Sequence, residues 1–218
     1  MKYLIGVGCG CFNYLLYTAG MYDLREGQER NFIREAMPHT WKQVCRVVVY
    51  LAAAVLFAFL FADYGYGPLK VVRYCLLMGG LVPIAYEDYR EQKIPNRWLF
   101  VLAAIRGALF AAEALLYPSA AYENLKFTLF GAAAGGILLF VAYVISRHGI
   151  GMGDVKLFAV IGMYLGAELT YIVIIASLLI AAVYAMAKVV AKKLQVKDEI
   201  AFAPFIAIGT ILILGLGF

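Results

Sequence analysis

Two acidic residues beside apolar runs have the type and placement that hydrolytic chemistry needs. Asp88 follows one apolar run, and Asp154 precedes another run much later in the chain. Two carboxylates held close together share a proton, because like charges at short range cannot both ionise easily. One carboxylate can then take a proton from water while its protonated partner polarises a carbonyl group. If the fold brings them together, the pair predicts peptide hydrolysis.

Each aspartate also has a simpler interpretation. Asp is a favoured helix N-cap, and Asp154 stands where an apolar helix should begin. Asp88 could be a boundary charge that Arg90 or Lys93 neutralises. Taken singly, neither aspartate distinguishes catalysis from a structural role.

The residues around Asp154 are rich in glycine. Gly149, Gly151 and Gly153 alternate just before an apolar run, where glycine is costly to a helix. Such glycines make sense where the backbone takes a positive φ or another chain approaches closely. A loop that presents an acid to a bound peptide fits this need, whereas an ordinary turn is the simpler alternative. Lys156 either holds the ionised acid or orients this loop, or else it is a positively charged anchor.

The composition is that of an integral membrane protein. Of the 218 residues, 64% are hydrophobic and 15% are charged, against roughly 45–50% and about 25% in soluble domains. A water-soluble fold could not cover so much apolar surface, and the same excess excludes a disordered chain. The net charge is +5, but the Lys and Arg residues are dispersed, so no nucleic-acid partner is expected. We predict an all-α, polytopic helix bundle whose surroundings are the lipid bilayer.

The apolar runs predict about eight transmembrane helices, since a helix needs about 20 residues to cross a bilayer. They lie at 3–20, 44–62, 69–86, 98–116, 125–146, 155–165, 169–188 and 200–218. The sixth and seventh come from one long run, in which Gly166 to Glu168 offers a tight turn. Arg106 and Glu113 share a face of the fourth helix, which favours an ion pair over a substrate contact.

The positions of the basic residues orient these helices. Most of the 19 Lys and Arg residues lie in the segments 21–43, 87–97, 147–154 and 189–199 or next to them. Cytoplasmic loops carry the excess of Lys and Arg, so these segments are expected to face the cytosol. Both aspartates then lie at the cytoplasmic face of a multi-pass protein of the cytoplasmic (inner) membrane. No linker or repeat is visible, so residues 1–218 are expected to form a single domain.

Three motifs carry a resemblance to a known family. The first begins at Asp88 and ends at Asn96 and has the form D-x-R-x-x-x-I-P-N. The second covers residues 151–157 with the form G-x-G-D-x-K-L, and the third begins at Pro204 with the form P-F-x-x-x-G. In type, order and spacing they resemble those of the type IV prepilin peptidases, bacterial intramembrane aspartic proteases. The resemblance covers about residues 80–218, the core that carries the motifs.

The resemblance implies an aspartic endopeptidase. Its substrates would be prepilins or prepilin-like proteins (pseudopilins), cut after a glycine at the end of a short basic leader on the cytoplasmic side. Asp88 and Asp154 would be the two catalytic residues. The other motif residues would support the active-site loop (Gly151, Gly153 and Lys156) or have a substrate-side or structural role (Pro95, Asn96 and Pro204).

One feature departs from the larger members of that family. Those members carry a four-cysteine zinc site in the first cytosolic loop and also N-methylate the new amino terminus. Segment 21–43 contains no cysteine, and the chain has no C-x-x-C pair. We therefore expect no metal, no cofactor and no methyltransferase activity. In this respect the chain is similar to the short peptidases of tight-adherence pilus systems.

Two other interpretations remain open. In a multi-pass transporter or a pilus-assembly scaffold, Asp88 and Asp154 would bind an ion or a proton. That interpretation leaves the Ile-Pro-Asn and Pro-Phe motifs unexplained. The presenilin group shares G-x-G-D, but its Tyr-Asp and Pro-Ala-Leu motifs are missing, since Tyr86 precedes Glu87 and Pro204 precedes Phe205.

Overall fold

In the structure, a computed structural model, the described residues form helices joined by short turns. The described residues are 63–146, 150–191 and 200–217, together with six single residues: Cys11, Tyr14, Ala53, Val55, Phe57 and Phe59. No strand occurs in these ranges. The predicted helices at 3–20 and 44–62 lie outside the described residues, apart from the six single ones.

Five α-helices and one short 3₁₀ helix follow one another in the described ranges. They are α4 (Pro68–Glu91), α5 (Asn96–Leu116), η1 (Pro118–Ala120), α6 (Ala121–Ile145), α7 (Met152–Val190) and α8 (Ala203–Gly215). By length and composition, α4, α5, α7 and the combined segment of η1 and α6 could each cross a membrane. The predicted all-α membrane fold is confirmed, while the count of eight helices stays a prediction.

The chain divides into two compact units, and the boundary falls inside α4. Residues 1–83 and Gly217 form one unit, and residues 84–216 and Phe218 form the other. In the first unit the Lys70 ammonium lies over the Tyr66 ring, 3.7 Å from its centroid. Both aspartates belong to the second unit, and the expectation of a single domain stays a prediction.

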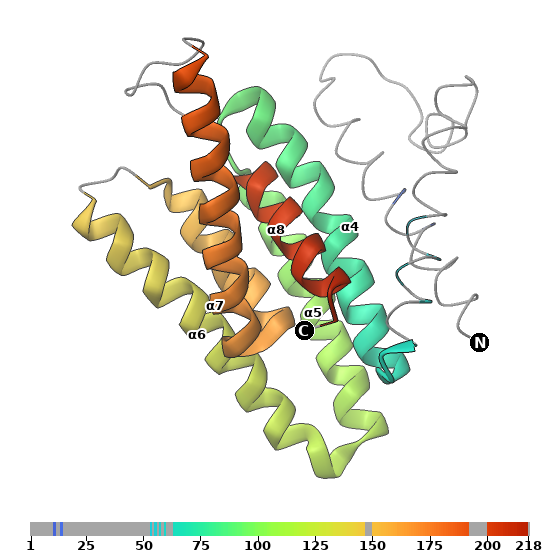
Figure 1. Cartoon of the computed structure of the whole chain (residues 1–218). Coiled ribbons are helices and arrows are strands. Elements are labelled where there is room, and N and C mark those ends of the chain that lie inside the picture. The colour runs from blue at the N-terminus through green and yellow to red at the C-terminus, as the bar shows by residue number, and fades with distance from the viewer. Residues whose placement is uncertain are drawn as a thin grey trace, which may run out of the picture. The chain divides into compact units, whose positions relative to one another are not determined.

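A chain reversal at Gly166 divides α7 into two arms. Gly166 has φ 77° and ψ 176°, which is not helical. On a straight helix Phe158 and Thr170 would lie about 18 Å apart, yet both lie next to Gly135 of α6. The two arms therefore run side by side in opposite directions (Figure 1). The turn that was predicted at this position is confirmed.

Helix α6 packs closely along α7 through glycines. A β-carbon built at Gly131 would collide with the backbone carbonyl of Gly162, and one built at Gly162 would collide with that of Gly131. Gly135 meets the backbone of Phe158 in the same way. Small residues that let two backbones touch are typical of helix contacts in membranes.

Replacement of Gly131 by alanine should therefore destabilise the helix bundle. The added methyl group has backbone on its far side, so α6 and α7 must separate, and overpacking of this kind costs about 1–3 kcal/mol. Thermal unfolding in detergent measures the effect. Gly107→Ala is the matched control, because nothing lies within 4 Å of a β-carbon there. An equal melting temperature for the two variants would contradict the close contact.

Helix α8 is shorter than the predicted span 200–218. It has 13 residues, with a proline in its first turn, and Leu216 caps it at the other end. Its Gly209 packs against Ser177 on the second arm of α7. The prediction was too long at both ends, because hydropathy alone does not locate caps. Conversely, α4 continues past the predicted end at Tyr86 and carries Asp88 in its last turns.

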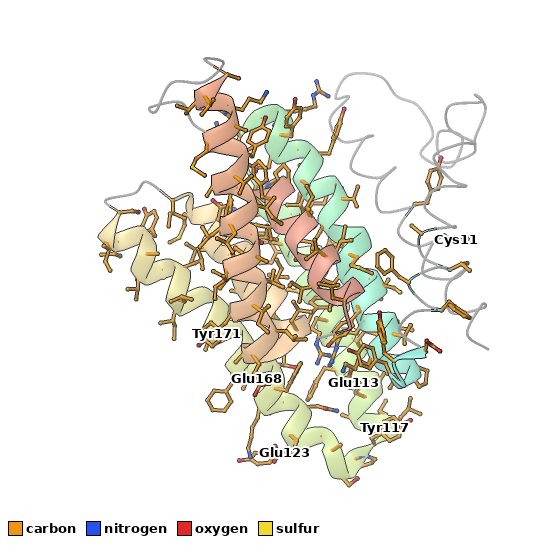
Figure 2. The ribbon with its side chains drawn as sticks, in the orientation of Figure 1. Cys11, Glu113, Tyr117, Glu123, Glu168 and Tyr171 are labelled. Carbon is orange, nitrogen blue, oxygen red and sulfur yellow. The ribbon has the colours of Figure 1, made fainter. Side chains whose placement is uncertain are left out.

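Arg106 joins three helices of the second unit. Its side chain is fully buried, and its guanidinium donates to the Met163 carbonyl (2.8 Å), Thr128 Oγ1 (2.8 Å) and Glu113 Oε2 (3.2 Å). The predicted ion pair with Glu113 is confirmed. Met163 lies just before the break in α7, where carbonyls lose their helical partners. Glu113 and Glu168 lie at the same end of the bundle, the lower end in Figure 2.

Candidate active site

The three sequence motifs meet at one end of the second unit. There α4 ends and α5, α7 and α8 begin, at the upper end of the view in Figure 1. The N-termini of three helices thus converge on the region that contains Asp88 and Asp154. A helix N-terminus offers free backbone N–H groups and a partial positive charge, both of which favour a carboxylate.

Asp88 is held by the first residue of α8. Its carboxyl is buried, with 5% of the residue exposed, and its Oδ2 atom accepts a hydrogen bond from the backbone N–H of Ala203 at 2.8 Å. No salt bridge joins Asp88 to Arg90 or Lys93 in the described part of the chain, and Arg90 lies over the Tyr86 ring instead. The interpretation of Asp88 as a charge neutralised by these residues is therefore wrong.

Asp154 lies in the first turn of α7 but is not its N-cap. The N-cap is Gly151, with φ −68° and ψ 137° and no capping side chain. Asp154 is three residues further on, and its carboxyl folds back to accept a hydrogen bond from the Gly151 backbone. Its Oδ2 would lie only 3.0 Å from a β-carbon at Gly151. This contact matches half of a capping box, so a structural contribution of Asp154 accompanies any chemical one.

The structure brings the two aspartates into electrostatic contact. The negative charge of Asp88 acts directly on the Asp154 carboxyl. Each carboxyl is anchored by a backbone group of a different helix start, Ala203 for Asp88 and Gly151 for Asp154. Two acids from motifs far apart in the chain thus interact electrostatically, which is a condition for proton sharing.

The turn between α4 and α5 links the two halves of the site. Pro95 is the N-cap residue of α5, and Asn96 is its first residue. Lys156 donates a hydrogen bond from Nζ to Asn96 Oδ1 at 3.0 Å. Of the three roles suggested for Lys156, orienting the loop fits this contact, because the acceptor is an amide and not an aspartate.

Gly153 packs against the same turn. A β-carbon at this position would lie 3.0 Å from Cβ of Ile94. Neither Gly151 nor Gly153 has a positive φ, so that part of the expectation is wrong. The expected close approach to Gly153 is present, and the group that approaches it among the described residues is the side chain of Ile94. Gly149 lies outside the described residues.

Gly153→Ala should lower turnover about tenfold or more at an unchanged protein level. The methyl group pushes Ile94 and the start of α7 apart, and misplacement of reacting groups by about 1 Å can cost 100-fold. Cleavage of a synthetic prepilin at matched membrane abundance measures this effect. Gly107→Ala again provides the control. Turnover equal to that of the control would remove Gly153 from the site.

Pro204 supports the contact between α8 and Asp88. It lies in the first turn of α8, directly after Ala203. Proline suits a helix start, because its missing N–H would have no partner there. The Phe202 ring, just before the helix, lies 6.3 Å from the Phe158 ring, centroid to centroid. Pro204 therefore has a structural position, at the start of the helix that holds Asp88.

Sequence reasoning missed Glu87. This acid precedes Asp88, is 2% exposed, and accepts hydrogen bonds from Arg97 and Trp98. The only signal in the sequence was an acid at the end of an apolar run with a basic residue beyond the next turn. Ile94 belongs to the first motif and Ala203 directly precedes the third, but their contacts could not be foreseen.

The described residues contain no group of three or more His, Cys, Asp or Glu side chains that could hold a metal ion. What the site offers instead is two carboxyls near each other, one buried and both fixed by backbone donors. Such a pair can exchange protons with a water molecule and a peptide group.

The chain is similar to a known protein family and to several curated proteins. The family model described as the type IV leader peptidase family matches residues 75–186, which include both aspartates. The prepilin leader peptidase/N-methyltransferase of Bacillus subtilis (strain 168) is 36% identical over 167 residues, 75% of this chain and 64% of the relative. Those of Aeromonas salmonicida (strain A449) and Dichelobacter nodosus are 28% and 26% identical, over 66% and 72% of this chain and 48% and 51% of their own.

No solved structure matches the chain significantly. The chain spans less than two thirds of the length of these curated relatives. The family model nevertheless covers about half of the chain, and the Bacillus subtilis relative exceeds 30% identity over three quarters of it. With the motifs gathered at one end of the bundle, these matches establish that the chain belongs to the type IV leader peptidase family.

Proposed function

We propose that this protein is an aspartic endopeptidase that removes the leader peptide from type IV prepilins or prepilin-like proteins. The observation that carries the proposal is the proximity of Asp88 and Asp154 in a member of the leader peptidase family. The two acids come from different motifs, and each is anchored by a helix start. Structural capping alone needs no second carboxylate nearby.

In the proposed reaction, the ionised aspartate takes a proton from water as the water oxygen attacks the scissile carbonyl carbon. The protonated aspartate donates a hydrogen bond to the carbonyl oxygen, which gains negative charge. Collapse of this tetrahedral species breaks the C–N bond, and a proton passes to the leaving amine. The products are the leader with a new carboxylate and the mature protein with a new amino terminus.

Backbone donors orient both carboxyls for this chemistry. The Asp88 carboxyl accepts backbone hydrogen bonds from Ala203 and Phe202, and the Asp154 carboxyl accepts one from Gly151. A hydrogen bond from a helix start stabilises the ionised form of a carboxylate. A side chain held in this way loses little further freedom when the substrate binds.

The active site is proposed to face the cytosol, in the inner membrane of a bacterium. The support is the concentration of Lys and Arg in the segments on the side of both aspartates. A prepilin with a basic leader and an apolar helix would leave its leader on that same side. The partners are thus the prepilin and the lipid bilayer, without nucleic acid.

The purified full chain in liposomes, mixed with synthetic prepilin-like peptides, tests the proposal. Mass spectrometry should find two products that sum to the substrate plus one water, with a single cut at the end of the basic leader. A panel of peptides with different apolar segments is needed, because the substrate is not specified. Intact peptides throughout the panel, with a correctly folded protein, would contradict the proposal.

Cleavage should need no metal ion, and the product should carry no methyl group on its amino terminus. The reason is that segment 21–43 contains no cysteine for a zinc site. Turnover after extended chelation and the mass of the mature amino terminus measure the two properties. Loss of activity that zinc restores, or a mass gain of one methyl group with S-adenosylmethionine, would contradict this prediction.

A further inference from the structure

Glu87 is a buried carboxylate that the proposed reaction does not use. It directly precedes Asp88 on α4, and 2% of the residue is exposed. Removal of a carboxylate from water is expensive unless partners compensate. A residue of this kind next to a reacting acid calls for a structural or functional reason.

The partners of Glu87 lie on the next helix. Its Oε1 atom accepts hydrogen bonds from Trp98 Nε1 and from the Arg97 guanidinium, each at 2.9 Å. Trp98 is buried, while the Arg97 side chain is 39% exposed. Both donors belong to the first turn of α5, so the contact joins the end of α4 to the start of α5 across their connecting turn. We call these three side chains, Glu87, Arg97 and Trp98, the α4–α5 clamp.

Neighbouring acids on α4 thus bind different helices. Successive helix residues point about 100° apart, and Glu87 meets α5 whereas Asp88 meets the start of α8. A rotation of the last turns of α4 would break both sets of contacts. The clamp therefore determines the direction in which Asp88 points.

The turn that the clamp closes is strained and touches the other half of the site. Gln92, which follows α4, has φ 51°, a conformation that costs a non-glycine residue about 1 kcal/mol. Beyond it, Ile94 packs against Gly153, and Asn96 accepts from Lys156. The same turn is thus fastened to α4 by the clamp and to the start of α7 by these two contacts.

We propose that Glu87 is a positioning residue whose clamp with Arg97 and Trp98 sets the placement of Asp88 relative to Asp154. This inference rests on the proposed peptidase function for its kinetic consequences. Glu87 does not touch the reacting groups in this proposal; it acts through the turn and through the backbone of α4.

Kinetics on a synthetic prepilin separate positioning from a merely structural role. Glu87→Leu should lower kcat about tenfold or more with KM within twofold, since misplaced reacting groups slow the chemical step. Glu87→Gln keeps an acceptor oxygen for Trp98 and Arg97 and should recover most of kcat. Glu91→Leu is the matched control: an exposed acid one turn later on α4, expected to leave both constants unchanged.

Three results would overturn the inference. These are an unchanged kcat for Glu87→Leu, an equal loss for the Gln variant, and a rise in KM without a fall in kcat. If Glu87→Leu does not fold, Trp98→Phe takes its place, because it removes the Nε1 donor and keeps a ring. An unchanged kcat for that variant would equally contradict the clamp.

A measurement without turnover distinguishes failure of this inference from failure of the proposed function. Asp88→Cys with Asp154→Cys, in a background with the four native cysteines replaced by alanine, is treated with a short bismaleimide. The rate of crosslinking should fall with Glu87→Leu and not with Glu91→Leu. If the wild type cleaves no prepilin but this difference is found, the function fails and the clamp stands. Equal rates in both variants would overturn the clamp, whatever the activity.

Discussion

Asp88→Asn and Asp154→Asn should each reduce prepilin cleavage by at least about 1,000-fold, the scale seen when a catalytic side chain is removed. Asparagine keeps an acceptor oxygen, so the bonds from Ala203 and Gly151 can persist. What it loses is the ability to ionise and to share a proton. The measurement is cleavage of a synthetic prepilin by equal amounts of inserted protein.

Glu123→Gln provides the control for these variants, because the Glu123 side chain is 71% exposed and pairs only at the surface with Lys126. Asp154→Ser should be inactive as well, since a hydroxyl cannot share a proton at working pH. Asp154 is not the N-cap, so asparagine is the sharper substitution at this position. Near-normal cleavage by either asparagine variant would contradict the catalytic role of that aspartate. It would favour an ion- or proton-binding function instead.

The second large effect is expected at Arg106. Arg106→Ala should lower the free energy of unfolding by about 3–5 kcal/mol, because it removes the guanidinium that pairs with the buried Glu113 carboxylate. It also removes the donors to Thr128 and to the Met163 carbonyl at the break in α7. Thermal unfolding in detergent should show a clear fall in melting temperature.

A double variant tests whether the broken ion pair is the reason for this loss of stability. Arg106→Leu combined with Glu113→Leu removes both charges, and replacement of a buried pair by apolar residues is often neutral or stabilising. The double variant should therefore melt above Arg106→Ala. Lys126→Ala, which breaks the exposed pair with Glu123, should change little. A wild-type melting temperature for Arg106→Ala would contradict the importance of this contact.

Features that depend on local composition and spacing could be predicted from the sequence. The membrane class follows from the excess of apolar residues, since no soluble fold could cover them. The turn at Gly166 was predictable because a run too long for one span and too short for two contains a glycine. The ion pair of Arg106 and Glu113 follows from their spacing on one helix face.

The two candidate acids could be identified, but not the way in which they are held. Residues 88 and 154 stood out by charge at the ends of apolar runs and by the motifs around them. The bond from Ala203 to Asp88 joins residues 115 positions apart, and no local pattern encodes such a pair. The exact start of α7 could not be predicted from the sequence either, since any residue from 151 to 154 could begin a helix.

The tertiary structure alone decided which partners the buried polar groups have. Glu87 reads in the sequence as one more charge near the membrane surface, yet it is buried against Trp98. Gly153 suggested a positive φ, but its small size serves the approach of Ile94. Hydropathy and helix spacing report which face of a helix is apolar, whereas contacts between helices depend on how those faces pack in three dimensions. For this protein the sequence by itself therefore determined the membrane fold class and the candidate acids, and only the packing of the helices decided their geometry.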